Sequence, residues 1–485
     1  MSPASRAAVA LGLMAGFYLL AVATGLGGFA LAWLLVTGKS VGLYKFAFLS
    51  AAAGGTVLWS LRPRLDTFEA PGPRLTKAGQ PELFGAIEDV ARATGQSMPA
   101  EVYAVADVNA FVSTRGGVLG IGGRRVMGLG VPLLHLLTVD ELKAVLAHEF
   151  GHYGGGDTKI GRLVYHTRLG LGRTLQAIEG KSIETLFAFY GSFVMRVSAG
   201  VSRHQEFAAD RFAARATSGV DLANSLTKVD RHGSLFGLFY VSNMRPLLEE
   251  RFWAPVGEGF RAFVADPMFN ELKVSVTVGG PDAGEAPPDT AYDTHPSTEE
   301  RIAALAYPPA SGSRLPDSRV ASSLVRELDE LEFALFKPED VVAAKLKRVA
   351  WPDVSPKVLV PRWRREALER EDILKQVRIE APPSDRATIV QLGRTHGGLK
   401  MRLKDDPEVM YHVLFGIACG VATRLIARGW TPAPSPSLGC TFVRGEDSID
   451  PMQQIFQIGN AQMPVEDWAA FCAREGLSGP IGPLD

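Results

Sequence analysis

The stretch of sequence that decides the fold is His148-Glu149-Phe150-Gly151-His152. Residues four positions apart lie on one face of an α-helix, so His148 and His152 present their imidazoles to the same point. Catalytic zinc uses two imidazoles in this arrangement as protein ligands, and Glu149 falls beside the position of the metal's water. The stretch therefore predicts a zinc hydrolase site, whereas the alternative is a pair of core histidines one turn apart.

The flanking sequence predicts that this stretch lies on one well-delimited, buried helix. Thr138 and Glu141 have the spacing of a capping box, with Thr138 as the N-cap and Glu141 three residues later. Three glycines, Gly154 to Gly156, end the helix just after the second histidine. Between these signals, apolar residues recur at helical spacing and predict a core-facing stripe, namely Leu142, Val145, Leu146 and Phe150.

The third metal ligand is not a nearby histidine. In the metzincin pattern another histidine would occupy position 158, but this chain has Thr158 there, and its hydroxyl is a poor zinc ligand. A carboxylate from a later helix is the alternative.

Three glutamates follow the motif as candidates for that carboxylate, and spacing alone does not choose among Glu179, Glu184 and Glu206. We favour Glu206 because Asp210 lies four residues later on the same helix face. One carboxylate can then bind the metal while the other orients a ligand imidazole. For Asp210, an ion pair with a neighbouring arginine is the alternative role.

With these residues the chain resembles the membrane-embedded zinc metallopeptidases of the HtpX and CAAX-prenyl-protease type, within the gluzincins. The resemblance covers roughly Leu75 to Tyr307 and rests on four segments in the family's order: Val108-Asn109-Ala110-Phe111, His148 to His152, Glu206 to Asp210, and Thr294-His295-Pro296-Ser297 followed by Glu300-Arg301-Ile302. It implies a mainly α, zincin-like α+β catalytic domain with a small β-sheet and one Zn²⁺ per chain, held by His148, His152 and Glu206.

The resemblance also implies roles outside the metal site. Asn109, Ala110 and Phe111 would form an edge strand along which an extended substrate pairs its backbone. His295 would lie near the active site and donate a hydrogen bond to the developing oxyanion, although a histidine before proline can equally be a packing or capping residue. Arg301 would either pair with a site carboxylate or face solvent.

The N-terminus predicts a membrane anchor. No charged residue occurs between Arg6 and Lys39, which is more than the roughly 20 residues that a helix needs to cross a bilayer. A second apolar stretch runs from Val41 to Trp59 and is interrupted only by Lys45, so the pair predicts a transmembrane hairpin. A cleavable signal peptide is the alternative, because Ala21-Val22-Ala23 resembles a cleavage site.

The charges that flank the hairpin predict its orientation. Arg6, Arg62 and Arg64 lie at its outer ends, against Lys39 and Lys45 in the connecting loop. By the positive-inside rule this excess places both chain ends, and with them the catalytic domain, in the cytoplasm of a multi-pass inner-membrane protein.

This chain departs from the family's pattern between the motif and the third ligand, where family members often carry further membrane helices. The apolar run within Ile183 to Val201 is bracketed by Glu184 and Arg196 and is too short to span comfortably. We predict a buried or membrane-skimming helix there. The apolar stretch from Pro407 to Arg428 is similarly predicted to be a packed core helix.

Length and composition complete the prediction. A chain of 485 residues is too long for one core, and we divide it into an anchor (1–62), a gluzincin metallopeptidase domain (63–340) and a C-terminal α+β region (341–485). The formal net charge of −1 gives no reason to expect a nucleic-acid partner. Three cysteines, all late in the chain, imply no disulfide framework.

The sequence therefore predicts a membrane-anchored zinc endopeptidase whose partners are the lipid bilayer and a peptide or protein substrate. One alternative is a zinc hydrolase that acts on a non-peptide bond such as a lipid amide, against which the candidate edge strand argues. The other is a non-catalytic membrane binding protein that keeps the zinc fold. Glu149 argues against that, because a structural zinc site needs no general base.

Overall fold

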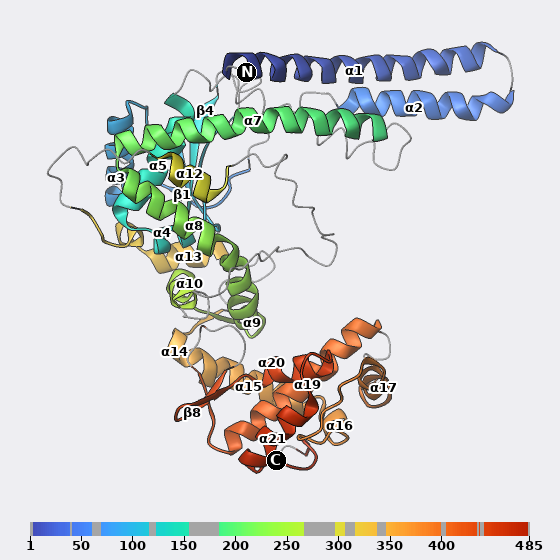
Figure 1. The fold of residues 1–485 in the computed structure, drawn as a ribbon, viewed down its shortest axis with the longest axis vertical. Coiled ribbons are helices and arrows are strands. Elements are labelled where there is room, and N and C mark those ends of the chain that lie inside the picture. The colour runs from blue at the N-terminus through green and yellow to red at the C-terminus, as the bar shows by residue number, and fades with distance from the viewer. Residues whose placement is uncertain are drawn as a thin grey trace. The chain divides into compact units, whose positions relative to one another are not determined.

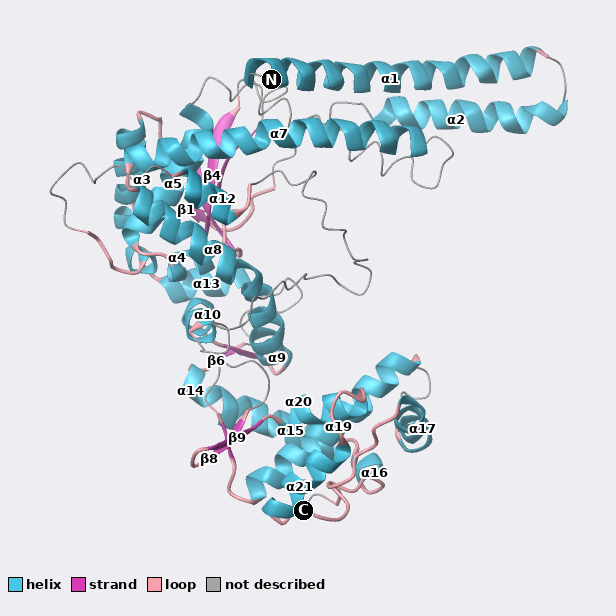
Figure 2. Cartoon of the chain, in the orientation of Figure 1, coloured by secondary structure: helices cyan, strands magenta, loops and turns pink. Residues whose placement is uncertain are grey.

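The computed structural model describes residues 3–38, 41–60, 69–115, 123–154, 184–265, 296–305, 316–336, 346–398, 404–433, 436 and 441–483. It is mostly helical with small sheets, as predicted (Figures 1 and 2). The chain divides into two compact units, the first made of residues 1–233 and 279–328 and the second of residues 234–278 and 329–485. The division at residues 62 and 340 that the sequence suggested stays a prediction.

The first unit begins with a hairpin of two apolar helices, α1 (Pro3–Thr37) and α2 (Tyr44–Ser60). Glycines allow the two backbones to approach closely, because a Cβ atom on Gly54 would lie 2.5 Å from the carbonyl oxygen of Gly25. The Ser50 hydroxyl also donates a 2.9 Å hydrogen bond to the carbonyl of Gly28. Large apolar side chains point outward along both helices, among them Leu19, Leu26, Trp33, Phe48, Leu49 and Trp59.

A four-stranded sheet lies at the centre of the first unit. Its strands are β1 (Arg74–Leu75), β2 (Glu101–Val105), β3 (Ala110–Arg115) and β4 (Arg124–Gly130), in the order β1-β2-β4-β3. β3 pairs antiparallel with β4, and within the described residues its other edge pairs with no strand. The strand-prone stretch of residues 102–114 is thus split between two strands, and β3 is an edge strand.

Helices complete the first unit. They are α3 (Pro81–Thr94), α4 (Val131–Leu136), α5 (Val139–Gly154), α7 (Glu184–Ala216), α8 (Gly219–Phe239) and α12 (Thr298–Ala304). α7 is one continuous helix that contacts α5 and also runs along α1 (Figure 1). Two described helices are long and apolar enough to cross a bilayer, Ala15–Thr37 and Asp406–Ala427. The apolar run of residues 183–201 is not among them, in agreement with the prediction for that segment.

The second unit is built around α19 (Asp406–Ala427), whose contacts include α15 (Val360–Leu368), α17 (Arg386–His396) and α20 (Pro451–Gly459). The apolar window of α19 is 61% buried, against 11% in the window of α1, so the prediction of a packed core helix is confirmed. The remaining elements of this unit are α9 (Arg245–Glu249), β5 (Phe252–Trp253), α10 (Val256–Val264), α13 (Leu328–Phe336), β6 (Lys347–Arg348), α14 (Trp351–Val354), α16 (Glu371–Leu374), α21 (Val465–Glu475) and the sheet of β7 (Thr431–Pro432), β8 (Phe442–Arg444) and β9 (Asp447–Ile449).

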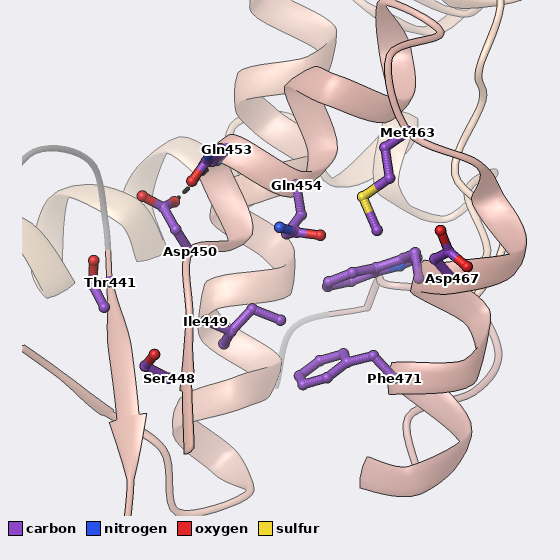
Figure 3. Close-up of a pocket in the computed structure, with 10 residues that line it drawn as sticks. Thr441, Ser448, Ile449, Asp450, Gln453, Gln454, Met463, Asp467 and Phe471 are labelled. Atoms are coloured by element: carbon purple, nitrogen blue, oxygen red, sulfur yellow. Dashed lines mark hydrogen bonds between the residues drawn. The ribbon is translucent and has the colours of Figure 1, made fainter. Parts of the chain in front are cut away.

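The second unit also contains an open pocket of about 400 Å³ beside α20 and α21. Its lining combines the aromatic ring of Phe471 with the carboxylates of Asp450 and Asp467 (Figure 3). Asp450 already caps α20, because its side chain accepts a hydrogen bond from the amide of Gln453.

Candidate active site

The motif helix α5 begins as its sequence predicts. The Thr138 hydroxyl accepts a 3.2 Å hydrogen bond from the amide of Glu141, and the Glu141 carboxylate accepts a 2.8 Å hydrogen bond from the amide of Thr138. This reciprocal capping box fixes the first turn, and the apolar stripe then seats the helix, since Leu142, Leu146 and Phe150 are fully buried. The rotation of the helix about its axis, and so the direction of both imidazoles, is therefore set by packing.

Glu206, the third candidate ligand, lies on α7 beside the two imidazoles of α5. The Nε2 atoms of His148 and His152 are 3.1 Å apart. His148 Nε2 lies 3.5 Å from Glu206 Oε2, and His152 Nε2 lies 3.6 Å from Glu206 Oε1. Ligand atoms about 2.1 Å from a tetrahedral zinc ion lie about 3.4 Å from one another. The spacing and the chemistry of these three donors thus fit zinc.

A glycine within the motif allows α7 to come this close. A Cβ atom on Gly151 would lie 3.1 Å from the Cα atom of Ala209, which is tighter than ordinary van der Waals contact. Ala209 is three residues after Glu206, one turn along α7. Gly151 therefore allows the helix that carries Glu206 to approach the helix that carries the histidines.

Asp210 makes both of the contacts weighed for it, one with an imidazole and one with an arginine. Its Oδ1 atom lies 2.9 Å from His148 Nδ1, which orients the imidazole so that Nε2 faces the metal position. Arg301 Nε and Nη2 donate hydrogen bonds of 2.8 and 2.6 Å to the two oxygens of the same carboxylate. Arg301 itself is placed by α12, which begins with a capping box between Ser297 and Glu300. Two helices far apart in the sequence thus hold the Asp210 carboxylate against the His148 imidazole.

The site shifts the pKa values of its ionisable groups in opposite directions. Burial alone would lower the pKa of His148, but hydrogen bonds to Asp210 and Glu206 outweigh it and raise the pKa to about 9. Burial lowers the pKa of His152 to about 4, and burial raises the pKa of Glu149 to about 7. A carboxylate with a pKa near neutrality can both accept and return a proton at physiological pH.

The outer edge of β3, which pairs with no described strand, lies against the motif's glutamate. The amide of Val112 is 3.4 Å from Glu149 Oε2, so this N–H points away from β4 and toward the active site. In an antiparallel strand, residues two apart direct their backbone groups to the same side, so Ala110 and Thr114 share this orientation. The ring of Phe111 covers the neighbouring strand, because a Cβ atom on Gly128 would lie 2.3 Å from it.

The residues that form this arrangement lie in a stretch of sequence that matches a known peptidase family. Residues 77–308 match the sequence profile of peptidase family M48. Residues 77–308 form an M48 peptidase domain. The chain is a metallopeptidase.

Known proteases resemble the chain over this M48 domain and beyond it. The chain is 27% identical to a protease HtpX homologue of Tropheryma whipplei (strain Twist) over 309 residues, which cover 58% of this chain and 89% of that protein. It is 27% identical to protease HtpX of Vibrio parahaemolyticus over 231 residues, which cover 42% and 69%. A segment of 44 residues is 52% identical to a protease HtpX homologue of Saccharolobus solfataricus and covers 9% and 14%. No solved structure matches the chain.

The structure thus brings together His148, Glu149, His152, Glu206 and Asp210 of the M48 domain. Asn109 is exposed just before β3, and Ala110 and Phe111 begin that strand. His295 and Glu179 lie outside the described residues, as does the side chain of Glu184.

Sequence reasoning missed two contributions to the site. The Val112 amide is a backbone group, so no residue type marks it. Gly151 could have been noticed from the sequence, because a glycine inside a helix lowers the stability of that helix. Such a glycine often marks a place where another backbone packs closely.

Proposed function

We propose that this chain is a membrane-anchored zinc endopeptidase in which His148, His152 and Glu206 hold the metal and Glu149 is the general base. One observation carries the proposal: the Glu149 carboxylate, next in sequence to His148 of the candidate metal-ligand cluster, lies 3.4 Å from the Val112 amide on the outer edge of β3. A peptide paired with that edge would present its backbone carbonyls next to both the base and the metal position. A structural zinc site would need neither the base nor the open strand.

The proposed mechanism uses the chain's own groups around one bound ion. His148, His152 and Glu206 would hold the zinc ion, which would supply a Lewis acid that makes a water molecule a stronger nucleophile near neutral pH. Glu149 takes a proton from the attacking water at a carboxylate oxygen and returns it to the leaving amine, and its burial, which raises the pKa of the carboxyl, favours its taking up that proton. Asp210 holds His148 in position during this exchange. In this proposal His295 donates a hydrogen bond to the oxyanion that develops on the attacked carbonyl.

The proposed location is the inner membrane, with α1 and α2 as the anchor and the active site in the cytoplasm. The outward-facing apolar side chains of the hairpin support the anchor, and the arginines that flank it support the orientation. A reporter fused at the C-terminus should behave as cytoplasmic, whereas one inserted between Lys39 and Lys45 should behave as external. An external C-terminal reporter would reverse the orientation.

The test of the activity is cleavage of casein, an unfolded protein, by the full chain in detergent. Cleavage should stop with a zinc chelator and return when zinc is restored. A chain that leaves casein intact but hydrolyses a lipid amide in a chelator-sensitive way would move the proposal to the non-peptide alternative. Zinc binding without hydrolysis of either substrate would favour the non-catalytic alternative.

A further inference from the structure

α7 is packed at both of its ends, and the end away from the active site contacts the hairpin. The Tyr190 hydroxyl donates a 2.6 Å hydrogen bond to the backbone carbonyl of Leu13 in α1. Beside it, Val194 of α7 is 2% exposed in a small cluster with Phe17 and Val57, both fully buried. Gly16 provides the space for the hydroxyl, because a Cβ atom there would lie 2.3 Å from Tyr190 Oη. We call these six residues the hairpin–α7 contact.

α7 connects this contact to the proposed metal site. α7 is one helix from Glu184 to Ala216, and Glu206 follows Tyr190 by sixteen residues, about 24 Å along the axis at 1.5 Å per residue. Glu206 and Asp210 lie on the same unbroken helix as Tyr190, so an axial displacement of α7 against α1 would move both carboxylates in the same direction. Near Glu206, α7 packs closely against α5, because a Cβ atom on Gly151 would lie only 3.1 Å from the Cα atom of Ala209. Metal ligands tolerate misplacement of only about 0.5 Å.

We propose that Tyr190 is a positioning residue for the metal site. Its hydrogen bond to Leu13 sets the axial position of α7 against the hairpin, and through α7 it sets the position of Glu206. The hairpin is then part of the support of the active site as well as an anchor. This inference rests on the proposed role of Glu206 as a metal ligand.

The test uses Gly16→Ala in the full chain in detergent, which places a methyl group against the Tyr190 hydroxyl. The matched control is Gly12→Ala, one turn earlier on the same helix, where a Cβ atom meets nothing within 4 Å. Two quantities are measured: the zinc dissociation constant by chelator competition, and the visible absorption spectrum of the Co²⁺-substituted protein. Gly16→Ala should weaken zinc binding by about 2- to 30-fold, the range for a change that acts through packed elements, and should alter the spectrum. Gly12→Ala should change neither.

A rescue experiment separates positioning from general damage. Adding Tyr190→Phe to Gly16→Ala removes the oxygen that clashes and leaves Cζ as the next atom, 3.5 Å from the added methyl group. The double variant should therefore bind zinc more tightly than Gly16→Ala alone, although Tyr190→Phe by itself should bind it more weakly than the wild type. If Gly16→Ala does not fold, Tyr190→Phe alone carries the test.

The outcomes are distinct. Lower thermal stability in Gly16→Ala and Tyr190→Phe with a wild-type zinc constant and cobalt spectrum would overturn the inference and leave the contact purely structural. A wild-type chain that binds no zinc would instead overturn the proposed function.

Discussion

Both units of this chain bury charged side chains, but they use them differently. In the second unit Glu332 is 1% exposed, and its two oxygens accept hydrogen bonds of 2.7 and 3.1 Å from the amides of Val256 and Gly257 at the start of α10. In the first unit the buried carboxylates of Glu206 and Asp210 face a histidine and an arginine from other helices. Burial of a charge therefore does not mark an active site. The feature that points to an active site is the convergence of several ionisable groups from separate elements.

The largest effect that follows from this difference concerns Glu149, which lies beside the metal position without being a ligand. Glu149→Gln should lower the rate of casein cleavage by about 10²- to 10⁴-fold, because it removes the proton acceptor. The variant should keep about one zinc per chain, measured by metal analysis. His148→Ala should lose both zinc and activity. Turnover near the wild-type rate in Glu149→Gln would end the proposed mechanism.

The next effect concerns the third ligand. Glu206→Ala should weaken zinc binding by about 10²-fold or more, since it leaves two histidines to hold the metal. Glu184→Ala, at the start of the same helix, and Glu332→Ala, in the second unit, should both keep their zinc. Full metal occupancy in Glu206→Ala would mean that another residue is the third ligand. The buried carboxylates of the first unit would then not differ in this respect from Glu332 in the second unit.

A smaller loss is expected from Asp210→Asn, which keeps the size of the side chain but weakens its bonds to His148 and Arg301. Zinc affinity should fall by about 10- to 100-fold, as for other groups that orient a ligand imidazole. Chelator competition measures this change. An affinity equal to that of the wild type would mean that Asp210 serves only the ion pair with Arg301.

The pH dependence of zinc binding tests the same cluster of charges. In the metal-free protein the pKa of His148 is raised to about 9, so at pH 7 zinc must displace a proton from this imidazole. Raising the pH removes that proton beforehand, so the affinity should rise by about tenfold per pH unit from pH 7 and level off near pH 9. Calorimetry in buffers of different ionisation enthalpy should show about one proton released at pH 7. No proton release would contradict the raised pKa.

The smallest effect on function is expected in the second unit. Glu332→Gln keeps one good acceptor for α10 but loses the charge, which should lower the free energy of unfolding by about 1 to 3 kcal/mol. Zinc affinity and casein cleavage should not change. Glu330→Gln, an exposed residue on the same helix, is the matched control and should alter neither stability nor function. A loss of zinc in Glu332→Gln would show that the two units are coupled.

The sequence predicted the features whose causes are local. The capping box at Thr138 and the two imidazoles one turn apart both depend on residues within one helix. Glu206 was different, because the spacing of three glutamates did not choose among them and the choice needed Asp210 and a family resemblance. The Val112 amide could not be predicted, since its position depends on the pairing of β3 with β4.

Tertiary contacts also corrected one predicted helix. The amphipathic pattern of residues 322–336 by itself favours one continuous helix, but α13 begins only at Leu328. Glu327 takes a positive φ of 51°, which breaks the helix. The side chain of Gln80 holds the preceding residue, because it accepts a 2.7 Å hydrogen bond from the amide of Arg326 and donates a 3.0 Å bond to its carbonyl. A partner 246 positions away cannot be read from local periodicity.

The length of β3 has a consequence for the kind of protein that this enzyme would attack. A peptide that pairs with all six residues of β3 must be extended over about 20 Å, and few folded proteins offer such a free segment. Cleavage would then follow how often a client protein opens locally rather than which side chains flank the cut bond. A ligand that stabilises the client's fold should protect it from this enzyme, even though the ligand never touches the enzyme. Because the substrate would have to pair with one short strand, the rate of cleavage would thus depend on the stability of the client protein.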